Sequence, residues 1–181
     1  MTEIPTSPQP GPITDQEPIT GPEPITDPQP ITDPQPITDP DELARWIVRP
    51  GAPETLAARM GIKLLEASPH RLVGTMPVAG NKQLYGLLHG GAAVVLAETL
   101  GSIGAALHAG GGHIALGVDI NATHHRAVRG GIVTGVATAL NLGPATASYD
   151  VAVFDEAGNR TCTARITVAP NTPQRMQRGK K

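Results

Sequence analysis

The stretch GGAAVVLAETLGSIGAALH, residues 90–108, sets the architecture, because it is the one long helix that the sequence predicts. Its side chains are small or apolar on nearly every side, so we expect the helix to be buried. It begins at two glycines and stops at three more, 110–112, which suit a helix end. Gly101 and Gly104 have no side chain, and we expect them to let a neighbouring backbone approach closely.

Segments in which apolar and polar residues alternate lie on both sides of this helix, and a period of two indicates strands. Two strands are predicted before the helix and four after it, at 62–68, 71–78, 113–125, 131–141, 146–154 and 160–168. Their short connections favour antiparallel neighbours. Two short helices, 41–48 and 53–60, are predicted ahead of them, with Asp39 in the N-cap region of the first. The order indicates an α+β fold in which a curved antiparallel sheet of about six strands wraps one long buried helix.

The first forty residues form a repeat with a period of six. Pro-Ile-Thr-Asp occurs at 12–15, 24–27, 30–33 and 36–39, and Pro-Ile-Thr-Gly at 18–21. The many prolines remove backbone donors and favour extended backbone, and one Ile per repeat cannot build a core against the ordering entropy. We therefore predict a disordered acidic tail over 1–40, a folded domain over 41–170 and a basic disordered tail over 171–181.

The net charge of −2 conceals an asymmetry between the repeat and the rest of the chain. Residues 43–181 carry all 14 Lys and Arg against seven acidic residues, a balance of +7 that suits an anionic ligand or a solvated surface equally. Cys162 is the single cysteine, so no intrachain disulfide can form. No signal peptide and no apolar run near the roughly 20 residues of a membrane span is evident. We expect a cytoplasmic protein with neither a nucleic acid nor a membrane as partner.

Two motifs around the long helix resemble the signature of hotdog-fold thioesterases. The first is QLYGLLHGG at 83–91, and the second is Ala97-Glu98-Thr99, which places an acid nine residues after His89. The resemblance extends over 43–170 and includes NATHHR at 121–126 and Phe-Asp-Glu at 154–156. It is greatest to the group of 1,4-dihydroxy-2-naphthoyl-CoA hydrolases and 4-hydroxybenzoyl-CoA thioesterases. It implies a hotdog fold and an acyl-CoA thioesterase that releases CoA from an aromatic or medium-sized acyl group.

The chemistry of these residues fits thioester hydrolysis. Gly90 has no side chain to block a carbonyl, so its N–H at the helix N-terminus can polarise the thioester oxygen. Glu98 lies two turns into an apolar helix, where burial disfavours a charge, so a carboxylate there indicates a function. The resemblance implies that Glu98 attacks the thioester or activates water, that His89 and Gln83 orient the carbonyl or the attacking group, and that Ser102 positions the acid or the water.

The spacing along the helix predicts that two chains share each active site. Gly91 and Glu98 are separated by about 10 Å of helical rise, which is too far for both to touch one carbonyl carbon. A second subunit with its helix antiparallel would bring its Glu98 beside Gly90 of the first. We therefore expect at least a homodimer, and the resemblance adds a homotetramer.

Binding of the CoA nucleotide is assigned by resemblance alone. The resemblance implies that His124 and Arg126 contact CoA and that Arg129 is a further phosphate ligand. An ordinary charged surface explains these three residues nearly as well. The sequence departs from the relatives at 144–146, where a basic residue often follows the pair matched here by Leu142-Gly143. CoA is part of the substrate, so no cofactor is expected.

Other interpretations remain open. His89 could simply begin the helix, and Glu98 could be a buried acid paired with an Arg. The six histidines lack the ligand spacing of a metal site, and no Gly-x-Ser-x-Gly motif indicates a Ser-His-Asp hydrolase. A hotdog hydratase or dehydratase would use a His and an Asp in a different motif, which is not found. A non-catalytic acyl-CoA-binding module would gain nothing from Glu98.

Overall fold

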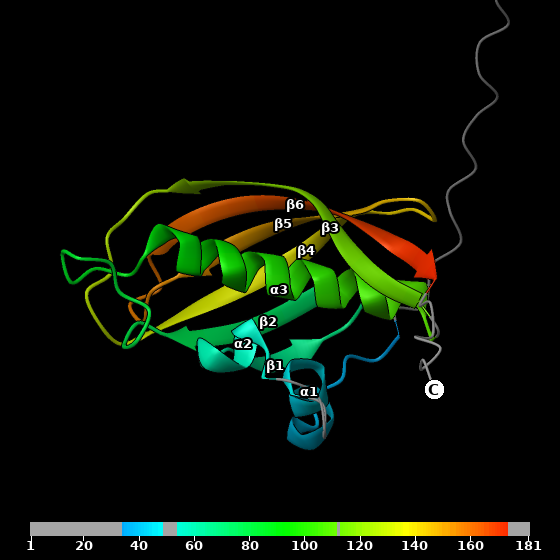
Figure 1. Cartoon of the computed structure of the whole chain (residues 1–181), viewed down its shortest axis with the longest axis horizontal. Coiled ribbons are helices and arrows are strands. Elements are labelled where there is room, and N and C mark those ends of the chain that lie inside the picture. The colour runs from blue at the N-terminus through cyan, green and yellow to red at the C-terminus, as the bar shows by residue number, and fades with distance from the viewer. Residues whose placement is uncertain (1–33, 49–53, 112, 174–181) are drawn as a thin grey trace, which may run out of the picture. The chain divides into compact units, whose positions relative to one another are not determined.

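The computed structural model of this chain describes residues 34–48, 54–111 and 113–173, which belong to one compact unit, Asp33–Lys181. The elements are α1 (Pro40–Ile47), α2 (Leu56–Arg59), β1 (Lys63–Ala67), β2 (Arg71–Pro77), α3 (Gly90–Ala109), β3 (His113–His124), β4 (Ile132–Leu142), β5 (Ala147–Phe154) and β6 (Arg160–Pro173) (Figure 1). Each predicted helix and strand is present. β6 continues into the segment predicted as the C-terminal tail. Residues 174–181 of that tail and residues 1–33 of the predicted N-terminal tail lie outside the described residues.

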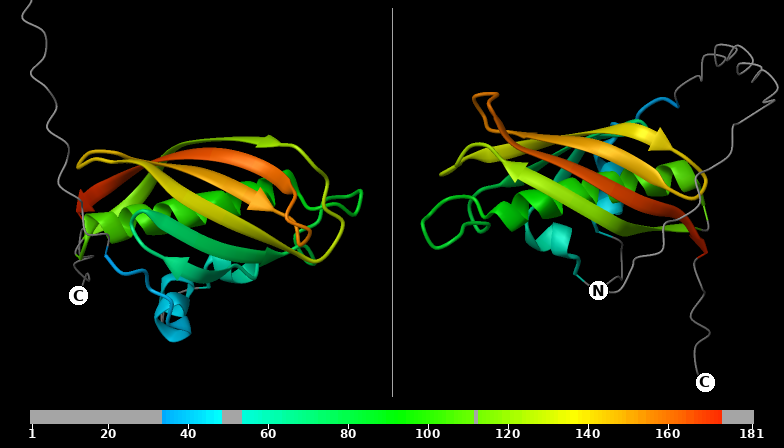
Figure 2. Two further views of the ribbon diagram at one scale, coloured as in Figure 1. Left: turned by 180° about the vertical axis from the view of Figure 1, so that it is seen from behind. Right: turned by 90° about the horizontal axis from the view of Figure 1, so that it is seen from above.

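The six strands form one antiparallel sheet with the order β1-β2-β4-β5-β6-β3. The sheet curves around α3, which lies along its concave face (Figure 1), and the view from behind shows the strands crossing the helix (Figure 2). This arrangement is the hotdog fold and confirms the predicted fold class.

The glycines of α3 make room for side chains of the sheet. A Cβ atom on Gly101 would lie 2.4 Å from Cγ2 of Ile166 in β6. A Cβ atom on Gly104 would lie 2.6 Å from Cδ1 of Leu72 and 2.7 Å from the Tyr149 hydroxyl. The expectation that another backbone approaches at these positions is therefore wrong, because the sheet contacts the helix through its side chains.

Substituting Gly104 by Ala is expected to destabilise the fold. Leu72 and Tyr149 are completely buried, and the Tyr149 hydroxyl donates to the Pro69 carbonyl at 2.8 Å, so neither side chain can move aside easily. Overpacking of this kind costs about 1–3 kcal/mol, which exceeds the roughly 1 kcal/mol that Ala gains over Gly in helix propensity. Urea denaturation measures the loss. Gly130→Ala, where a Cβ would meet nothing within 4 Å, is the matched control, and an equal effect of both substitutions would contradict the packing argument.

The helix is buried on one side only, which corrects the prediction that it is buried all round. Its sheet-facing side chains, such as Leu96 and Leu100, are completely buried, whereas Gly91 and Glu98 on the opposite side are exposed in the single chain. The sheet has too few strands to enclose the helix. By length and composition alone α3 could also cross a membrane, contrary to the sequence analysis, but half of it is buried against the sheet as in an ordinary core helix.

The last copy of the repeat belongs to the folded unit. Asp39 caps α1, because its Oδ1 accepts the N–H groups of Asp41 and Glu42 at 3.1 and 2.9 Å. Ile37 forms an antiparallel bridge with Ala67 at the end of β1 and packs against the core. The domain therefore begins earlier than the predicted residue 41. The single Ile of this repeat copy is enough to fix it to the folded domain, because the edge of β1 supplies backbone hydrogen-bond partners that the repeat by itself does not have.

Candidate active site

The loop between β2 and α3 carries the first motif, and Asn81 holds its two ends together. The Asn81 side-chain amide donates to the carbonyl oxygens of Met60 and Pro77, each at 2.8 Å. The Asn81 carbonyl accepts the N–H of His89 at 2.9 Å. Asn81 therefore positions the start of α3. Nothing in the sequence indicated this role, because the partners of Asn81 are backbone groups, which leave no signature in the sequence.

Gln83 closes the tip of this loop. The N–H of Gln83 donates to the Leu87 carbonyl at 2.8 Å, and the Gln83 carbonyl accepts the N–H of Gly86 at 3.0 Å. The side-chain Oε1 of Gln83 accepts the N–H of Tyr85 at 2.9 Å. Gly86 has a φ of +75°, which favours glycine. Leu84 and Tyr85 are pushed outward and are 98% and 81% exposed. With Oε1 engaged, the amide nitrogen is the end of Gln83 that can donate to a ligand.

His89 is the N-cap of α3. Its Nδ1 accepts the N–H of Gly91 at 2.9 Å, and its carbonyl accepts the N–H groups of Ala92 and Ala93 at 2.9 and 3.4 Å. This confirms that His89 begins the helix. Because Nδ1 is an acceptor, a neutral ring carries its proton on Nε2, which leaves that nitrogen as a donor on an exposed side chain.

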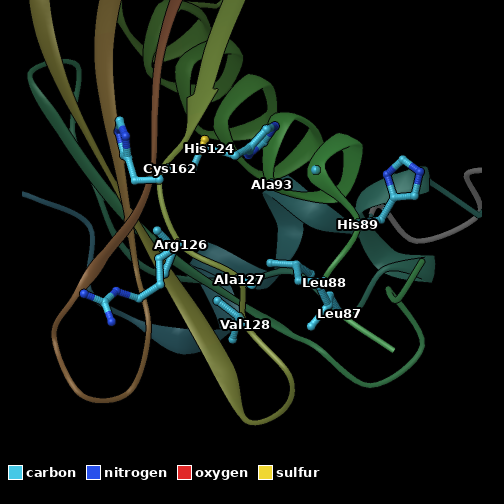
Figure 3. A pocket seen from close by; sticks show the side chains of 12 residues that line it. Leu87, Leu88, His89, Ala93, His124, Arg126, Ala127, Val128 and Cys162 are labelled. Atoms are coloured by element: carbon cyan, nitrogen blue, oxygen red, sulfur yellow. The ribbon is translucent and has the colours of Figure 1, made fainter. Parts of the chain in front are cut away.

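The N–H of Gly90 is the free donor of this first turn. The N–H groups of the three following residues are all bonded to His89, whereas among the described residues none accepts a hydrogen bond from Gly90. A Cβ atom on Gly90 would lie 2.7 Å from Nε2 of His124, at the end of β3, so a larger residue here would require the exposed His124 ring to move. The fold thus places His124 directly against the helix start, as the close view shows (Figure 3).

A cavity of about 260 Å³ opens beside this contact, and it is lined by His89, Gly90, His124, Arg126, Thr161 and Cys162 among others. Burial raises the pKa of the Cys162 thiol, which keeps it neutral and unsuited to act as a nucleophile. Nε2 of His125 lies 2.9 Å from Thr163 Oγ1. The predicted catalytic residues His89 and Gly90 therefore share one cavity with the predicted CoA-binding residues His124 and Arg126. Gln83 and Arg129 are not among its lining residues.

Glu98 and Ser102 lie at a different place on α3. Both line a hollow of about 290 Å³ together with Leu56, Val95 and others. Glu98 also lines a hollow of about 150 Å³ beside β3, where a Cβ atom on Gly117 would lie 3.0 Å from Glu98 Oε1. The expectation that Glu98 is buried is wrong for the single chain, and within the described part of the chain it forms no ion pair. The predicted site residues thus form two separate groups.

The Phe-Asp-Glu segment that contributes to the resemblance is a structural turn. Asp155 accepts hydrogen bonds from the side chain and backbone of Asn159, and these, with smaller contributions from Ala157 and Arg126, lower the pKa of its carboxyl group. Glu156 accepts the N–H of Ile132 at 3.3 Å. These acids hold the loop ends of β4, β5 and β6 and need no catalytic role.

Comparison with known proteins decides the family. Residues 85–162 match the profile of the Thioesterase superfamily. A proofreading thioesterase EntH from Klebsiella pneumoniae is 40% identical over 129 residues, which span 71% of this chain and 94% of that protein. The EntH of Cronobacter turicensis is 42% identical over 116 residues, or 64% of this chain and 85% of the relative. The chain belongs to the thioesterase superfamily.

The solved structure of a thioesterase from Pseudomonas aeruginosa supports this assignment, with 34% identity, a TM-score of 0.66 and coverage of 72% of this chain and 92% of that one. In this thioesterase the segment that matches the family profile, residues 85–162, includes every predicted site residue except Gln83. No group of three or more potential metal ligands is found among the residues that the structure describes.

Proposed function

We propose that this thioesterase hydrolyses acyl-CoA thioesters with an aromatic or medium-sized acyl group to the free acid and CoA. The observation that carries the proposal is the N–H of Gly90 at the N-terminus of α3, for which the described residues offer no acceptor. A donor at a helix N-terminus, on a residue that has no side chain of its own, suits an oxyanion that develops on a thioester carbonyl. His89 and Gln83 each present a further donor on the same loop and assist in orienting the carbonyl.

Glu98 performs the bond-breaking step in this proposal. It either attacks the carbonyl carbon, forming an anhydride that water then cleaves, or removes a proton from the attacking water. In both routes the C–S bond breaks and the CoA thiolate leaves and is protonated. Ser102 lies one turn further along α3 in the same hollow and positions the carboxylate or the water.

A second chain completes the site. Gly90 and Glu98 are separated by roughly 12 Å of helical rise, and they line different cavities. Hotdog thioesterases are typically oligomeric. The open side of α3 and the edge strand β3, with exposed Leu116 and Val118, offer the apolar surface that a two-fold partner would cover. An antiparallel partner helix brings its Glu98 to the first chain's Gly90, in a homodimer or in a homotetramer.

CoA binds at the cavity beside Gly90 in this proposal. His124 and Arg126 line that cavity, and they supply a hydrogen-bond donor and a positive charge for the nucleotide phosphates. Arg129 lies in the same loop between β3 and β4, is exposed, and provides a second positive charge in this proposal. The acyl group then extends from Gly90 toward the partner's Glu98.

A thiol-release assay tests the function. Benzoyl-CoA and hexanoyl-CoA are expected to release free CoA thiol in proportion to enzyme, and crotonyl-CoA tests the hydratase alternative. Loss of the enoyl absorbance of crotonyl-CoA without thiol release would indicate a hydratase. Saturable binding of all three thioesters without any turnover would indicate a binding module. Either result would refute the proposal.

A further inference from the structure

The outer edge of β1 holds one Pro-Ile-Thr-Asp unit, residues 36–39. The N–H of Ile37 donates to the Ala67 carbonyl at 2.9 Å, and the Ile37 carbonyl accepts the N–H of Ala67 at 3.0 Å. The Ile37 side chain is half-buried and packs against the hydrophobic core. These contacts use one backbone position and one side chain of the unit.

The same unit recurs upstream with the same neighbours. Residues 34–40 are Pro-Gln-Pro-Ile-Thr-Asp-Pro, and residues 28–34 have the identical sequence. Residues 22–28 differ from it only in having Glu23 in place of the Gln. Each of these segments therefore offers the same backbone groups for pairing with Ala67 and the same Ile side chain for packing against the core.

Exchange of one unit for another leaves α1 intact. Asp39 caps α1 through the N–H groups of Asp41 and Glu42, two and three residues further along the chain. This cap is local and survives when Ile37 leaves β1. A shift by one repeat then requires only that six residues loop out, and the entropy of closing a loop changes slowly with its length. An anchor on the same chain also has a high effective concentration.

We propose that the β1 edge at Ala67 is a docking site for the Pro-Ile-Thr-Asp unit itself, and that the upstream unit at 30–33 takes the place of 36–39 there. Different units of the tandem repeat can thus pair with the same edge strand, one at a time. An uncovered edge is a template for pairing with other chains. The prolines at 34, 36 and 40 have no N–H to donate, so a docked unit closes the edge without extending the sheet.

Four full-length proteins test the proposal. They are the unchanged chain, Ile37→Ser, the upstream set Ile13→Ser, Ile19→Ser, Ile25→Ser and Ile31→Ser, and the combination of both. We expect the upstream set to melt like the unchanged chain and Ile37→Ser to lose little. The combination should melt clearly lower than Ile37→Ser, and its Ala67 amide should exchange with solvent about tenfold faster, since no unit remains to accept and protect that N–H.

The controls separate docking from a general effect of the tail. Leu65→Ser alters an exposed position of β1 away from the bridge, and its effect should be the same with and without the upstream isoleucines. Protection of the Ala67 amide in Ile37→Ser should not change over a hundredfold range of protein concentration. Equal melting and exchange in Ile37→Ser and the combination would overturn the proposal. Protection that fades on dilution would also overturn it, because the occupant would then come from a second chain.

Discussion

Replacing Glu98 by Gln is expected to lower kcat by about 10²–10⁴-fold, the usual contribution of one positioned acid–base group. Gln has the same shape but can neither accept a proton at neutral pH nor attack a carbonyl. The fold should be unaffected, since Glu98 is exposed in the single chain and forms no ion pair within the described residues. The measurements are kcat on the best CoA thioester and the thermal midpoint.

Asp119 provides a matched control for this substitution. Its carboxylate lines the same small hollow beside β3 as Glu98 and is also exposed. Asp119→Asn removes an equal charge from the same surface, and we expect kcat to stay within a few-fold of the unchanged enzyme. Turnover close to normal in Glu98→Gln, or an equal loss in both variants, would remove Glu98 from the mechanism.

Mixing two inactive variants is expected to restore activity, because each site is proposed to take Gly90 from one chain and Glu98 from the other. One parent carries Glu98→Gln. The other carries His89→Ala with Gly90→Ala, and the added methyl group on residue 90 would lie 2.7 Å from Nε2 of His124. A mixed dimer then has one site with both lesions and one with neither. Its activity should reach up to half that of an intact dimer.

Subunit exchange must be demonstrated in the same samples, for example by energy transfer between labelled parents. Activity should rise with the fraction of mixed dimers, while each parent taken through the same treatment stays inactive. If the chains exchange and no activity returns, Glu98 acts within its own chain. The roughly 12 Å of helix between Gly90 and Glu98 would then have to be spanned in some other way.

The local pattern of apolar and polar residues was sufficient to predict the helices and strands of this fold. The alternation that predicted strands at 131–141 and 146–154 corresponds to β4 and β5 within one residue at each end, since a half-buried strand must alternate. The helix at 90–108 was equally clear, because its glycine ends and its apolar content are properties of neighbouring residues. The N-cap role of Asp39 follows from the same kind of local chemistry.

Contacts between distant residues could not be predicted in this way. Gly104 faces Leu72 and Tyr149, Ile37 pairs with Ala67, and His124 covers Gly90. In each case the partners come from different elements, and only the register of the folded sheet brings them together. The helix also looked buried on all sides, because composition shows that a residue is apolar but does not show how many strands are available to cover it.

The candidate active-site motif and the order of the elements were therefore readable from the sequence, since both depend on short-range spacing along the chain. The sequence placed the N–H of Gly90 at the helix start, and the structure added that none of the described residues accepts it and that His124 lies against Gly90. Only the structure showed that Glu98 is exposed in the single chain and lines different cavities from Gly90. The physical reason is that hydrogen-bond pairing and burial are set by neighbours in space, which a linear pattern does not specify.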